Sequence, residues 1–349
     1  MGKEKLKFID LFAGIGGFHL AMHAQGLECV FASEIDKFAR LTYHENFKRR
    51  SPDLFKNGLF NEDINNIDPK NIPDFDVLCA GFPCQPFSYA GKNKGFKDKT
   101  RGTLFFSILK ILEAKQPRAF LLENVKGLKS QDGGRTLGTI IESLEELGYD
   151  VHWKVLDSLN FGVPQKRERW YCVGFKKATK FRFPVGVTRT PKLSDIVDPK
   201  NKDPKLGLPV QELSMIDYHF KKATNGERIK HSHAKYEVGS KKRRHGVYSY
   251  QKPDGSLRFH IGDVAKTQIQ ESFYCCLGTY APTIIYNRVP KMWDLRRKLS
   301  VQECIALQGF PKTFRFPVSE NQAYKQLGNS VALPVVSAIS KLLIKHLIK

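Results

Sequence analysis

The feature that most restricts the fold is a regular alternation of short apolar runs with stretches of helical periodicity in the first 183 residues. Short apolar runs bounded by turns are typical of buried strands, whereas a period of 3.6 residues is typical of helices. Strands that alternate with helices predict a parallel, doubly wound α/β sheet. The predicted strands are 7–12, 29–32, 75–80, 119–123 and 170–175, and the predicted helices are 18–25, 104–114 and 137–147.

The pattern changes after this region. From residue 186 to residue 317 the chain is rich in loops, with short strand-like runs, and helical periodicity returns at 321–347. We therefore expect a catalytic and cofactor-binding domain formed by 1–185 plus 318–349. A smaller, loop-rich recognition domain with its hinge should occupy 186–317.

Charge and cysteine usage restrict the partners. The net charge is +22, and residues 186–317 supply more than half of it, with 24 Lys and Arg against 12 Asp and Glu. Such an excess favours polyanionic partners, although a basic, solvated surface is the plainer alternative. The seven cysteines form no C-x-x-C pair, so we expect neither a disulfide framework nor a metal site. No apolar run reaches the ~18 residues of a membrane span, and the charged N-terminus does not resemble a signal peptide.

A glycine-rich turn, Asp10-Leu-Phe-Ala-Gly-Ile-Gly-Gly-Phe18, joins the first predicted strand to the first predicted helix. A dinucleotide fingerprint needs a third glycine where this chain has His19, which disfavours a pyrophosphate ligand. Glu34 follows the second strand, where its carboxylate could accept both hydroxyls of a ribose, and Asp63 could accept an adenine amino proton. Each feature alone could be tight packing or a solvated acid. Together, in this order, they indicate a cofactor that carries adenosine.

The segment Gly81-Phe-Pro-Cys-Gln-Pro-Phe-Ser88 carries the strongest chemical signal. A single cysteine is more often buried and inert than reactive. Cys84, however, follows a predicted strand end, and prolines at 83 and 86 fix the backbone around it. The loop at 91–102 has five cations and one acid, so it could close over a phosphate backbone or simply be solvated. These surroundings favour Cys84 as a nucleophile.

Two further segments place ionisable side chains near strand ends. Glu123 ends an apolar strand, where desolvation would raise its pKa and let it act as an acid, although a helix cap or a surface carboxylate is also possible. Arg167 and Arg169 lie on the same side of an extended segment. They could hold a base carbonyl, the Glu123 carboxylate or a phosphate, or lie on a solvated strand face.

In this order, the motifs resemble those of the C5-cytosine-specific DNA methyltransferases of the bacterial restriction-modification type. The resemblance covers nearly the whole chain outside 186–295. Residues 12–17 are similar to the family's cofactor loop, 83–85 to its catalytic loop and 123–125 to its catalytic acid motif. Residues 297–311 resemble the segment that supports the recognition domain, and 326–331 resemble the returning C-terminal motif.

The resemblance implies a Rossmann-like methyltransferase domain that uses S-adenosyl-L-methionine. The catalytic residues that it implies are Cys84, Glu123, Arg167 and Arg169. Those that it assigns to the cofactor are Phe12, Ala13, Gly14, Gly16, Glu34, Ile35, Asp63, Ile64, Pro83, Leu104, Asn329, Ser330 and Val331. Those that it assigns to DNA are Gln85, Ser88, Lys92, Lys94, Lys97, Arg101 and Gln165.

The implied chemistry suits these side chains. C5 of cytosine is a poor nucleophile, and a soft thiolate that adds to C6 turns the ring into an enamine. Glu123 would stabilise the added species through N3 and the exocyclic amine, and Arg167 would steady the base carbonyl. Because a stacked base cannot reach such a site, the target must be flipped out of the duplex.

The resemblance leaves the recognised sequence open. Thr279, Tyr280, Trp293 and the run Lys241–Arg244 are candidates for base contacts, although the run is better suited to phosphates or to solvent. Double-stranded DNA is the expected partner, and enzymes of this type usually accompany a restriction endonuclease. We expect a monomer in the bacterial cytoplasm, associated with the nucleoid through DNA.

Three other functions compete with this one. A cytosine methyltransferase that acts on tRNA would share the motifs, but the large basic stretch at 186–317 favours sequence reading in duplex DNA. A catalytically silent DNA-binding regulator would not need Cys84, Glu123 and the cofactor loop together. A dinucleotide-dependent oxidoreductase is disfavoured by His19.

Overall fold

The computed structural model describes residues 5–83, 104–187, 189–223, 227–238, 243–262, 270–285 and 288–348. Its largest element is a seven-stranded sheet, in the order β3 (Phe60–Asn61), β2 (Glu28–Ser33), β1 (Lys7–Leu11), β4 (Val77–Gly81), β5 (Ala119–Val125), β8 (Glu168–Phe175) and β6 (Asp150–Asp157). The first five strands are parallel, and β8 is antiparallel to β5 and to β6. This topology confirms the predicted doubly wound, mostly parallel sheet.

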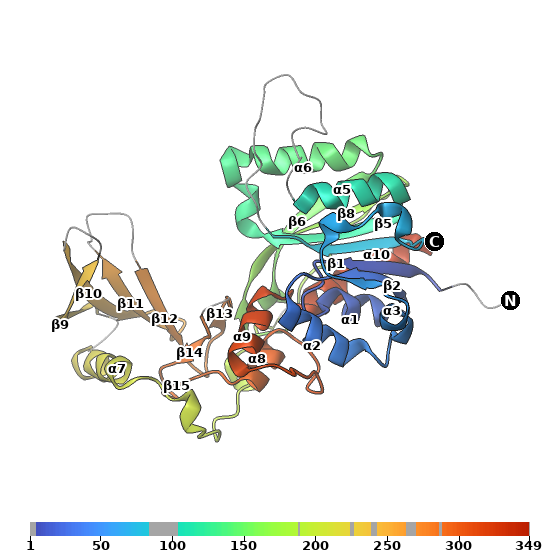
Figure 1. The fold of residues 1–349 in the computed structure, drawn as a ribbon. Coiled ribbons are helices and arrows are strands. Elements are labelled where there is room, and N and C mark those ends of the chain that lie inside the picture. Colours follow the sequence, from blue (N-terminus) through green and yellow to red (C-terminus); the bar gives the residue numbers. More distant parts are fainter. Residues whose placement is uncertain are drawn as a thin grey trace.

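Helices cover both faces of this sheet, α5 and α6 on one side and α1, α2 and α10 on the other (Figure 1). Each face of the sheet forms a hydrophobic core with the helices that cover it, and alternate residues of each strand belong to opposite cores. Leu121 faces α1 and α10, whereas Leu122 faces α5 and α6. The helices are α1 (Gly17–His23), α2 (Lys37–Phe47), α3 (Pro52–Lys56), α5 (Leu104–Lys115), α6 (Arg135–Glu146), α7 (Val210–Lys222), α8 (Val301–Leu307), α9 (Glu320–Asn329) and α10 (Leu333–Leu347).

The structure contains elements of the first body that the sequence did not predict, including the short strand β3 and the short helix α3. The sequence did not predict α2, in which charged and apolar residues alternate closely, or the edge strand β6, in which Trp153 and Lys154 are exposed. The predicted helical stretch 321–347 is two helices, because the backbone of Ser330 and Ala332 is extended. Pro334 lies in the first turn of α10, where its missing N–H costs no helical hydrogen bond.

Gly174 on β8 lies opposite Phe120 on β5, and the aromatic ring covers the glycine. A Cβ added to Gly174 would lie 2.2 Å from ring carbons of Phe120. We expect Gly174→Ala to lower the free energy of unfolding by about 1–3 kcal/mol through overpacking. Urea unfolding measures this change. Gly138→Ala in α6 is the control, since nothing lies within 4 Å of its added Cβ; equal unfolding free energies for both variants would contradict the prediction.

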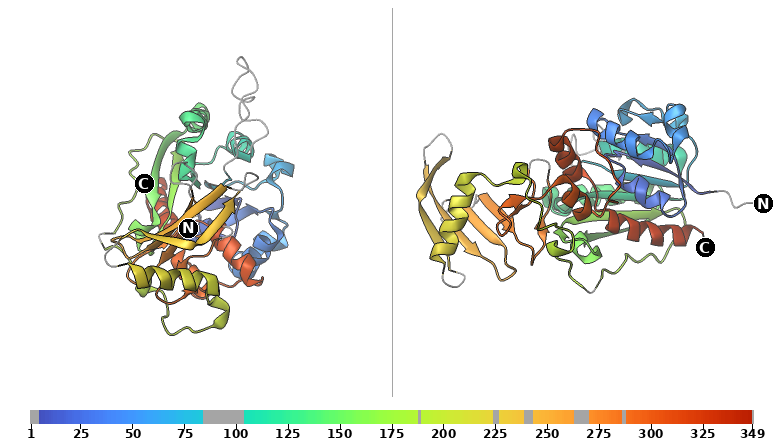
Figure 2. Two further views of the ribbon diagram at one scale, coloured as in Figure 1. Left: turned by 90° about the vertical axis from the view of Figure 1, so that its left-hand side faces the viewer. Right: turned by 90° about the horizontal axis from the view of Figure 1, so that it is seen from below.

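A second, smaller body extends away from the first (Figure 2) and contains α7 and a six-stranded sheet. Its strands are ordered β15 (Arg297–Lys298), β14 (Lys291–Met292), β12 (Gln270–Cys275), β11 (Leu257–Gly262), β10 (Arg243–Gln251) and β9 (Ile229–Val238), and a separate pair joins β13 (Ala281–Pro282) to β7 (Gln165–Lys166). One face of the six-stranded sheet packs on α7 through Leu257, Phe259 and Ile216.

The second body has more regular structure than its sequence suggested, since β9 and β10 have 10 and 9 residues and α7 has 13. The many Lys, His and Tyr residues of β9 and β10 hide the alternation that marks a half-buried strand. The division of the chain at 186 and 317 stays a prediction. Within 186–317, α8 packs into the core of the first body through Cys304, Ile305 and Leu307.

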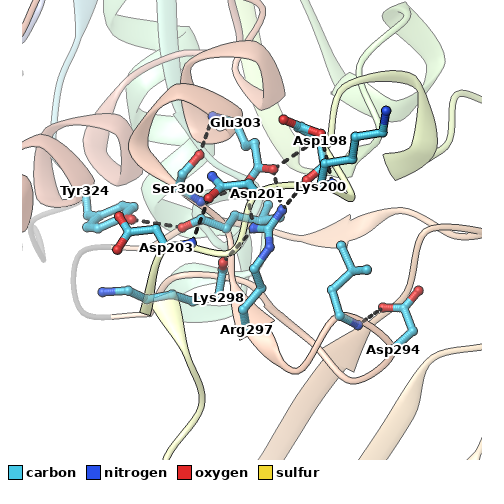
Figure 3. A network of polar contacts seen from close by, with 12 residues as sticks. Asp198, Lys200, Asn201, Asp203, Asp294, Arg297, Lys298, Ser300, Glu303 and Tyr324 are labelled. Carbon is cyan, nitrogen blue, oxygen red and sulfur yellow. Dashed lines mark hydrogen bonds and ion pairs between the residues drawn. The ribbon is translucent and has the colours of Figure 1, made fainter. Parts of the chain in front are cut away.

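A buried ion pair joins the two bodies at the base of the small sheet (Figure 3). The Arg297 guanidinium donates to both carboxylate oxygens of Glu303, at 2.7 and 2.8 Å, and to the carbonyl of Asp198 at 2.9 Å. Burial alone would raise the pKa of Glu303, but hydrogen bonds from Arg297 and Ser300 hold it below its usual range. The pair therefore holds β15 against the start of α8 and against the segment at Asp198. The charges of Arg297 and Glu303 compensate each other in this buried position.

Among the described residues, no single helix is both long and apolar enough to cross a membrane, although α9 and α10, bent by 41°, meet that length and composition criterion as a pair. The described residues also contain no group of three or more His, Cys, Asp or Glu side chains that could hold a metal ion.

Candidate active site

A cavity of about 440 Å³ lies at the carboxyl ends of β1, β2, β4 and β5. Open α/β sheets bind their ligands at this edge. Many residues that the sequence assigned to the site line this cavity. They are Phe12, Gly14, Glu34, Ile35, Asp63, Ile64, Pro83, Leu104, Glu123, Arg167, Arg169 and Asn329.

The glycine-rich turn gives the cavity one wall. Gly14 and Gly16 have φ angles of +55° and +85°, a region that glycine adopts without strain, and Phe12 shares it at +54°. A Cβ added to Gly16 would lie 2.2 Å from the ring of Phe47 on α2. The turn therefore lets α2 pack closely while the N–H of Gly14 points at Glu34.

Glu34 is held by two backbone N–H groups. Its Oε2 accepts from Gly14 at 2.7 Å and its Oε1 accepts from Asp36 at 2.8 Å. Burial raises the pKa of this carboxyl, and the two backbone hydrogen bonds oppose the rise. Each oxygen keeps lone pairs for a ligand, so the carboxylate could accept two neighbouring hydroxyls.

Asp63 and Ile35 lie farther along the same wall. Oδ1 of Asp63 accepts from the backbone and side chain of Asn65, at 2.9 and 3.0 Å, whereas Oδ2 accepts from none of the described residues. Ile35 is 70% exposed, which is unusual for a large apolar side chain that lines a cavity. A flat apolar ligand with an amino group would cover Ile35 and bond Asp63.

Glu123 is buried where β5 ends, and its Oε1 lies 3.3 Å from Nε of Arg169 on β8. Burial raises the pKa of Glu123, while the charges of Arg169 and Arg167 oppose that rise. A carboxyl whose pKa is raised by burial keeps its proton to higher pH than an exposed glutamate does, which suits a general acid.

The terminal nitrogens of Arg167 are engaged inside the protein, whereas its buried Nε has no hydrogen-bond partner among the described residues. Its Nη1 donates to the carbonyl of Ile284 at 3.0 Å, and its Nη2 donates to the carbonyls of Gly328 and Ser330 at 3.0 and 2.5 Å. Burial and the neighbouring Arg169 lower its pKa to about 9. Because its terminal nitrogens already join β8 to the segment before α10, this geometry disfavours the expectation that Arg167 grips the base carbonyl, which stays a prediction.

Gln165 also differs from its expected role. Its side chain is completely buried, donates to Leu307 and Gln308 at 3.1 and 3.2 Å, and accepts from the N–H of Ile284 at 3.0 Å. With its amide satisfied internally, Gln165 cannot reach DNA in this structure. The sequence could not show this, because its partners lie more than 100 residues away.

Four residues that the sequence assigned to the cofactor lie behind the cavity wall: Ala13, Gly16, Ser330 and Val331. Ser330 gives its carbonyl to Arg167, and a Cβ added to Gly17 would lie 2.4 Å from Val331. Their packing supports the wall without forming its surface. Several other predicted site residues lie outside the described residues: Cys84, Gln85, Ser88, Lys92, Lys94, Lys97 and Arg101.

Comparison with known proteins decides the family. The family model described as C-5 cytosine-specific DNA methylase matches residues 6–345. The chain belongs to this family. It is therefore a DNA cytosine-5-methyltransferase, which excludes the oxidoreductase and leaves the RNA enzyme and the silent regulator without support.

Relatives of similar length match the methyltransferase throughout. It is 40% identical to the type II methyltransferase M1.ScrFI of Lactococcus lactis subsp. cremoris, over 99% of this chain and 79% of that protein. It is also 40% identical to the type II methyltransferase M.NgoBI of Neisseria gonorrhoeae, over 96% of this chain and 92% of that protein.

Solved structures support the fold. The structure of Dnmt2 methyltransferase from S. pombe matches with a TM-score of 0.66 at 17% identity, over 99% of this chain and all of that one. A Dnmt2 mutant from Spodoptera frugiperda matches with a TM-score of 0.63 at 20% identity, over 97% of this chain and all of that one.

The cysteines that the structure describes in the methyltransferase are all buried: Cys29, Cys79, Cys172, Cys275, Cys276 and Cys304. Burial raises the pKa of each of these thiols, which disfavours the thiolate that a nucleophile needs. Among the seven cysteines of the chain, Cys84 is then the remaining candidate, and Pro83 before it lies in the cavity wall.

Sequence reasoning did not assign Asn124, Lys325 and Asp36 to the site, although these polar residues also line the cavity. Asn124, beside Glu123, is buried, and its Nδ2 has no hydrogen-bond partner among the residues that the structure describes. Lys325 on α9 donates to Asp36 at 3.0 Å and so closes the wall next to Glu34. The position of Asp36 after a strand was a signal for the site, whereas Lys325 carried none, because it is one of many lysines.

Proposed function

We propose that the methyltransferase binds S-adenosyl-L-methionine in the 440 Å³ cavity and methylates a flipped-out cytosine of a short duplex DNA sequence through a covalent bond between Cys84 and C6. The observation that carries this proposal is one cavity lined by both Glu34 and the buried pair of Glu123 and Arg169. Glu34 follows β2 and Glu123 lies near the end of β5, and these two strands are three strand spacings, or about 14 Å, apart. The cavity can therefore hold one ligand near Glu34 and a second ligand near Glu123.

The chain's residues fit an adenosine-bearing cofactor. Both oxygens of Glu34 are already oriented by backbone N–H groups and can accept the ribose hydroxyls. Asp63 offers Oδ2 to an adenine amino group, and Ile35 offers an exposed apolar side chain to the ring. When bound, the cofactor supplies an electrophilic methyl group on a sulfonium.

The reaction follows from the remaining groups. The Cys84 thiolate adds to C6, Glu123 hydrogen-bonds N3 and the exocyclic amine, and C5 gains the nucleophilic character that it lacks in cytosine. After C5 has taken the methyl group, its proton passes to water, N3 returns its proton to Glu123, and the bond between sulfur and C6 breaks, which restores the aromatic base and the thiolate. The raised pKa of Glu123 suits a group that donates a proton to N3.

The two arginines divide their roles. Arg169 uses Nε for Glu123 and Nη1 for the carbonyl of Glu168, at 2.8 Å, and its Nη2 has no partner among the described residues. We assign the contact with the base carbonyl to Arg169. Arg167, held by three carbonyls, positions β8 and the segment before α10.

The substrate and its context are part of the proposal. The basic second body favours duplex DNA read in the major groove over RNA. The relatives named type II methyltransferases suggest a restriction-modification system with a cognate endonuclease, and we propose that the enzyme acts as a monomer on the DNA of the nucleoid. Methyl transfer from labelled cofactor to duplex DNA and to tRNA, followed by bisulfite sequencing of the DNA, tests substrate and target together. Methyl transfer to tRNA without transfer to duplex DNA would refute the proposal that duplex DNA is the substrate.

Glu34→Ala is expected to weaken cofactor binding selectively. The change removes two acceptors for ribose hydroxyls, and hydrogen bonds to a charged group contribute about 1.5–3 kcal/mol each. We expect the Kd for the cofactor, measured by isothermal titration calorimetry, to rise by at least about tenfold. Glu28→Ala, at the exposed start of the same strand, is the control and should bind normally. A folded Glu34→Ala protein with an unchanged Kd would refute this cofactor site.

A further inference from the structure

A second cavity, of about 340 Å³, lies on the first body between the C-terminal end of α2 and the segment that follows α8. Four cationic side chains line it: Lys48, Arg49, Arg50 and Arg315. The methyl-transfer cavity is lined by Asp36 and Ala39 at the other end of α2. Because α2 has 11 residues, about 16 Å of helix separates the two sites.

Most of the positive charge of this second cavity has no ion-pair partner among the described residues. Its one acid, Glu45, pairs with Lys48 at 2.5 Å. Within the described part of the chain, no carboxylate forms an ion pair with Arg49, Arg50 or Arg315. Arginines without acidic partners around a concave surface are suited to oxyanions, which they bind through two parallel hydrogen bonds.

The positive charge near Arg50 also affects the neighbouring side chain of His23. Burial lowers the pKa of His23, and the charges of Arg50 and Lys5 lower it further. Arg50 also lines an adjacent cavity of about 450 Å³, together with Lys5, His23 and the acids Glu28 and Asp53. The adjacent cavity is therefore of mixed charge, and the excess of positive charge is confined to the 340 Å³ cavity that Lys48, Arg49, Arg50 and Arg315 line.

The backbone around the arginines is fixed. Asn46 donates through Nδ2 to the carbonyl of Arg315 at 2.8 Å and accepts through Oδ1 from its N–H at 3.0 Å. The same Nδ2 donates to the carbonyl of Thr42 at 2.8 Å, so the clamp is anchored on α2. This arrangement holds Arg315 beside Arg49 and Arg50 before any ligand binds.

We propose that this arginine-lined cavity binds the phosphate backbone of a second DNA segment while the first segment occupies the methyl-transfer site. The proposal goes beyond methyl transfer. Phosphate contacts are independent of sequence, so a second site would let the enzyme contact a new duplex before it releases the old one. Transfer between segments would then be faster than full dissociation.

The test measures release of a labelled target duplex from the full-length enzyme as unlabelled duplex without the target is added. With the wild-type protein, the release rate should increase with competitor concentration. In the variant Arg49→Gln, Arg50→Gln, Arg315→Gln, that dependence should be lost, while spontaneous release and methylation without competitor stay unchanged. The same release rates are then measured in inorganic phosphate and in chloride at equal ionic strength. If phosphate alone abolishes the dependence of the wild-type release rate on competitor concentration, the site binds phosphate groups.

The control variant removes three exposed lysines elsewhere on the same body: Lys154→Gln, Lys341→Gln, Lys345→Gln. It has the same change in net charge and should behave as the wild type. A triple arginine variant with undiminished competitor dependence would overturn the proposal. So would faster spontaneous release in that variant, because the arginines would then contact the first duplex. Arg315→Gln alone, with a partial loss, covers the case in which the triple variant fails to fold.

Discussion

Cys84→Ser is expected to abolish methyl transfer while leaving the affinity for duplex DNA largely intact. A serine hydroxyl is a far weaker nucleophile for C6 than a thiolate, and without the adduct C5 stays unreactive. Loss of a covalent nucleophile removes the step that the other groups support, so turnover should fall by at least about 10³-fold. Binding depends on phosphate contacts and base flipping, which the sulfur does not supply.

The experiment pairs two measurements on one preparation. Methyl transfer from labelled cofactor gives turnover, and fluorescence anisotropy with labelled duplex gives affinity. Cys276→Ser is a suitable control, because Cys276 is buried in the second body and its Sγ contacts the carbonyl of Gly255 at 3.5 Å. It should retain full activity. Wild-type methylation by Cys84→Ser, or inactivity of both variants, would remove the support for Cys84 as the nucleophile.

The sequence predicted those parts of the site that follow strand ends. In a parallel sheet the carboxyl ends meet at one edge, so Glu34 after β2 and Glu123 at the end of β5 had to approach the glycine-rich turn after β1. The contact of Gly14 with Glu34, at 2.7 Å, is the clearest instance. Periodicity and local order sufficed here, because each residue is placed by its own strand.

The roles of Gln165 and Arg167 could not be predicted in this way. The amide of Gln165 and the terminal nitrogens of Arg167 form hydrogen bonds with backbone groups of Ile284, Leu307 and Gly328, more than 100 residues away. A motif shows which residue types are present but not which backbone groups arrive beside them. The second body was obscured for a related reason, since β9 and β10 are strands stabilised by pairing and α7 rather than by an evident apolar pattern.

Glu123→Gln is expected to lower the rate of methyl transfer by about 10²–10⁴-fold, the usual contribution of a positioned acid or base. The amide keeps the shape of the carboxyl but can neither donate a proton to N3 nor balance the charge of Arg169 in the same way. Because Glu123 is buried, replacing it with a neutral amide should not reduce stability through desolvation. The defect should therefore lie in the chemical step, with cofactor and DNA affinities close to those of the wild type.

The pH dependence separates a proton donor from a merely structural acid. Burial raises the pKa of Glu123, so the protonated form persists to higher pH than for an exposed glutamate and is lost as pH rises through that raised pKa. The wild-type single-turnover rate should fall as the pH rises through the raised pKa of Glu123. The rate of Glu123→Gln should be low and should not show this fall. Glu168→Gln is the matched control, because Glu168 pairs with Lys126 at 2.8 Å outside the cavity. If the rate of Glu123→Gln showed the same fall as the wild-type rate, another group would be the acid, and the pairing with Arg169 would serve only to hold β5 against β8.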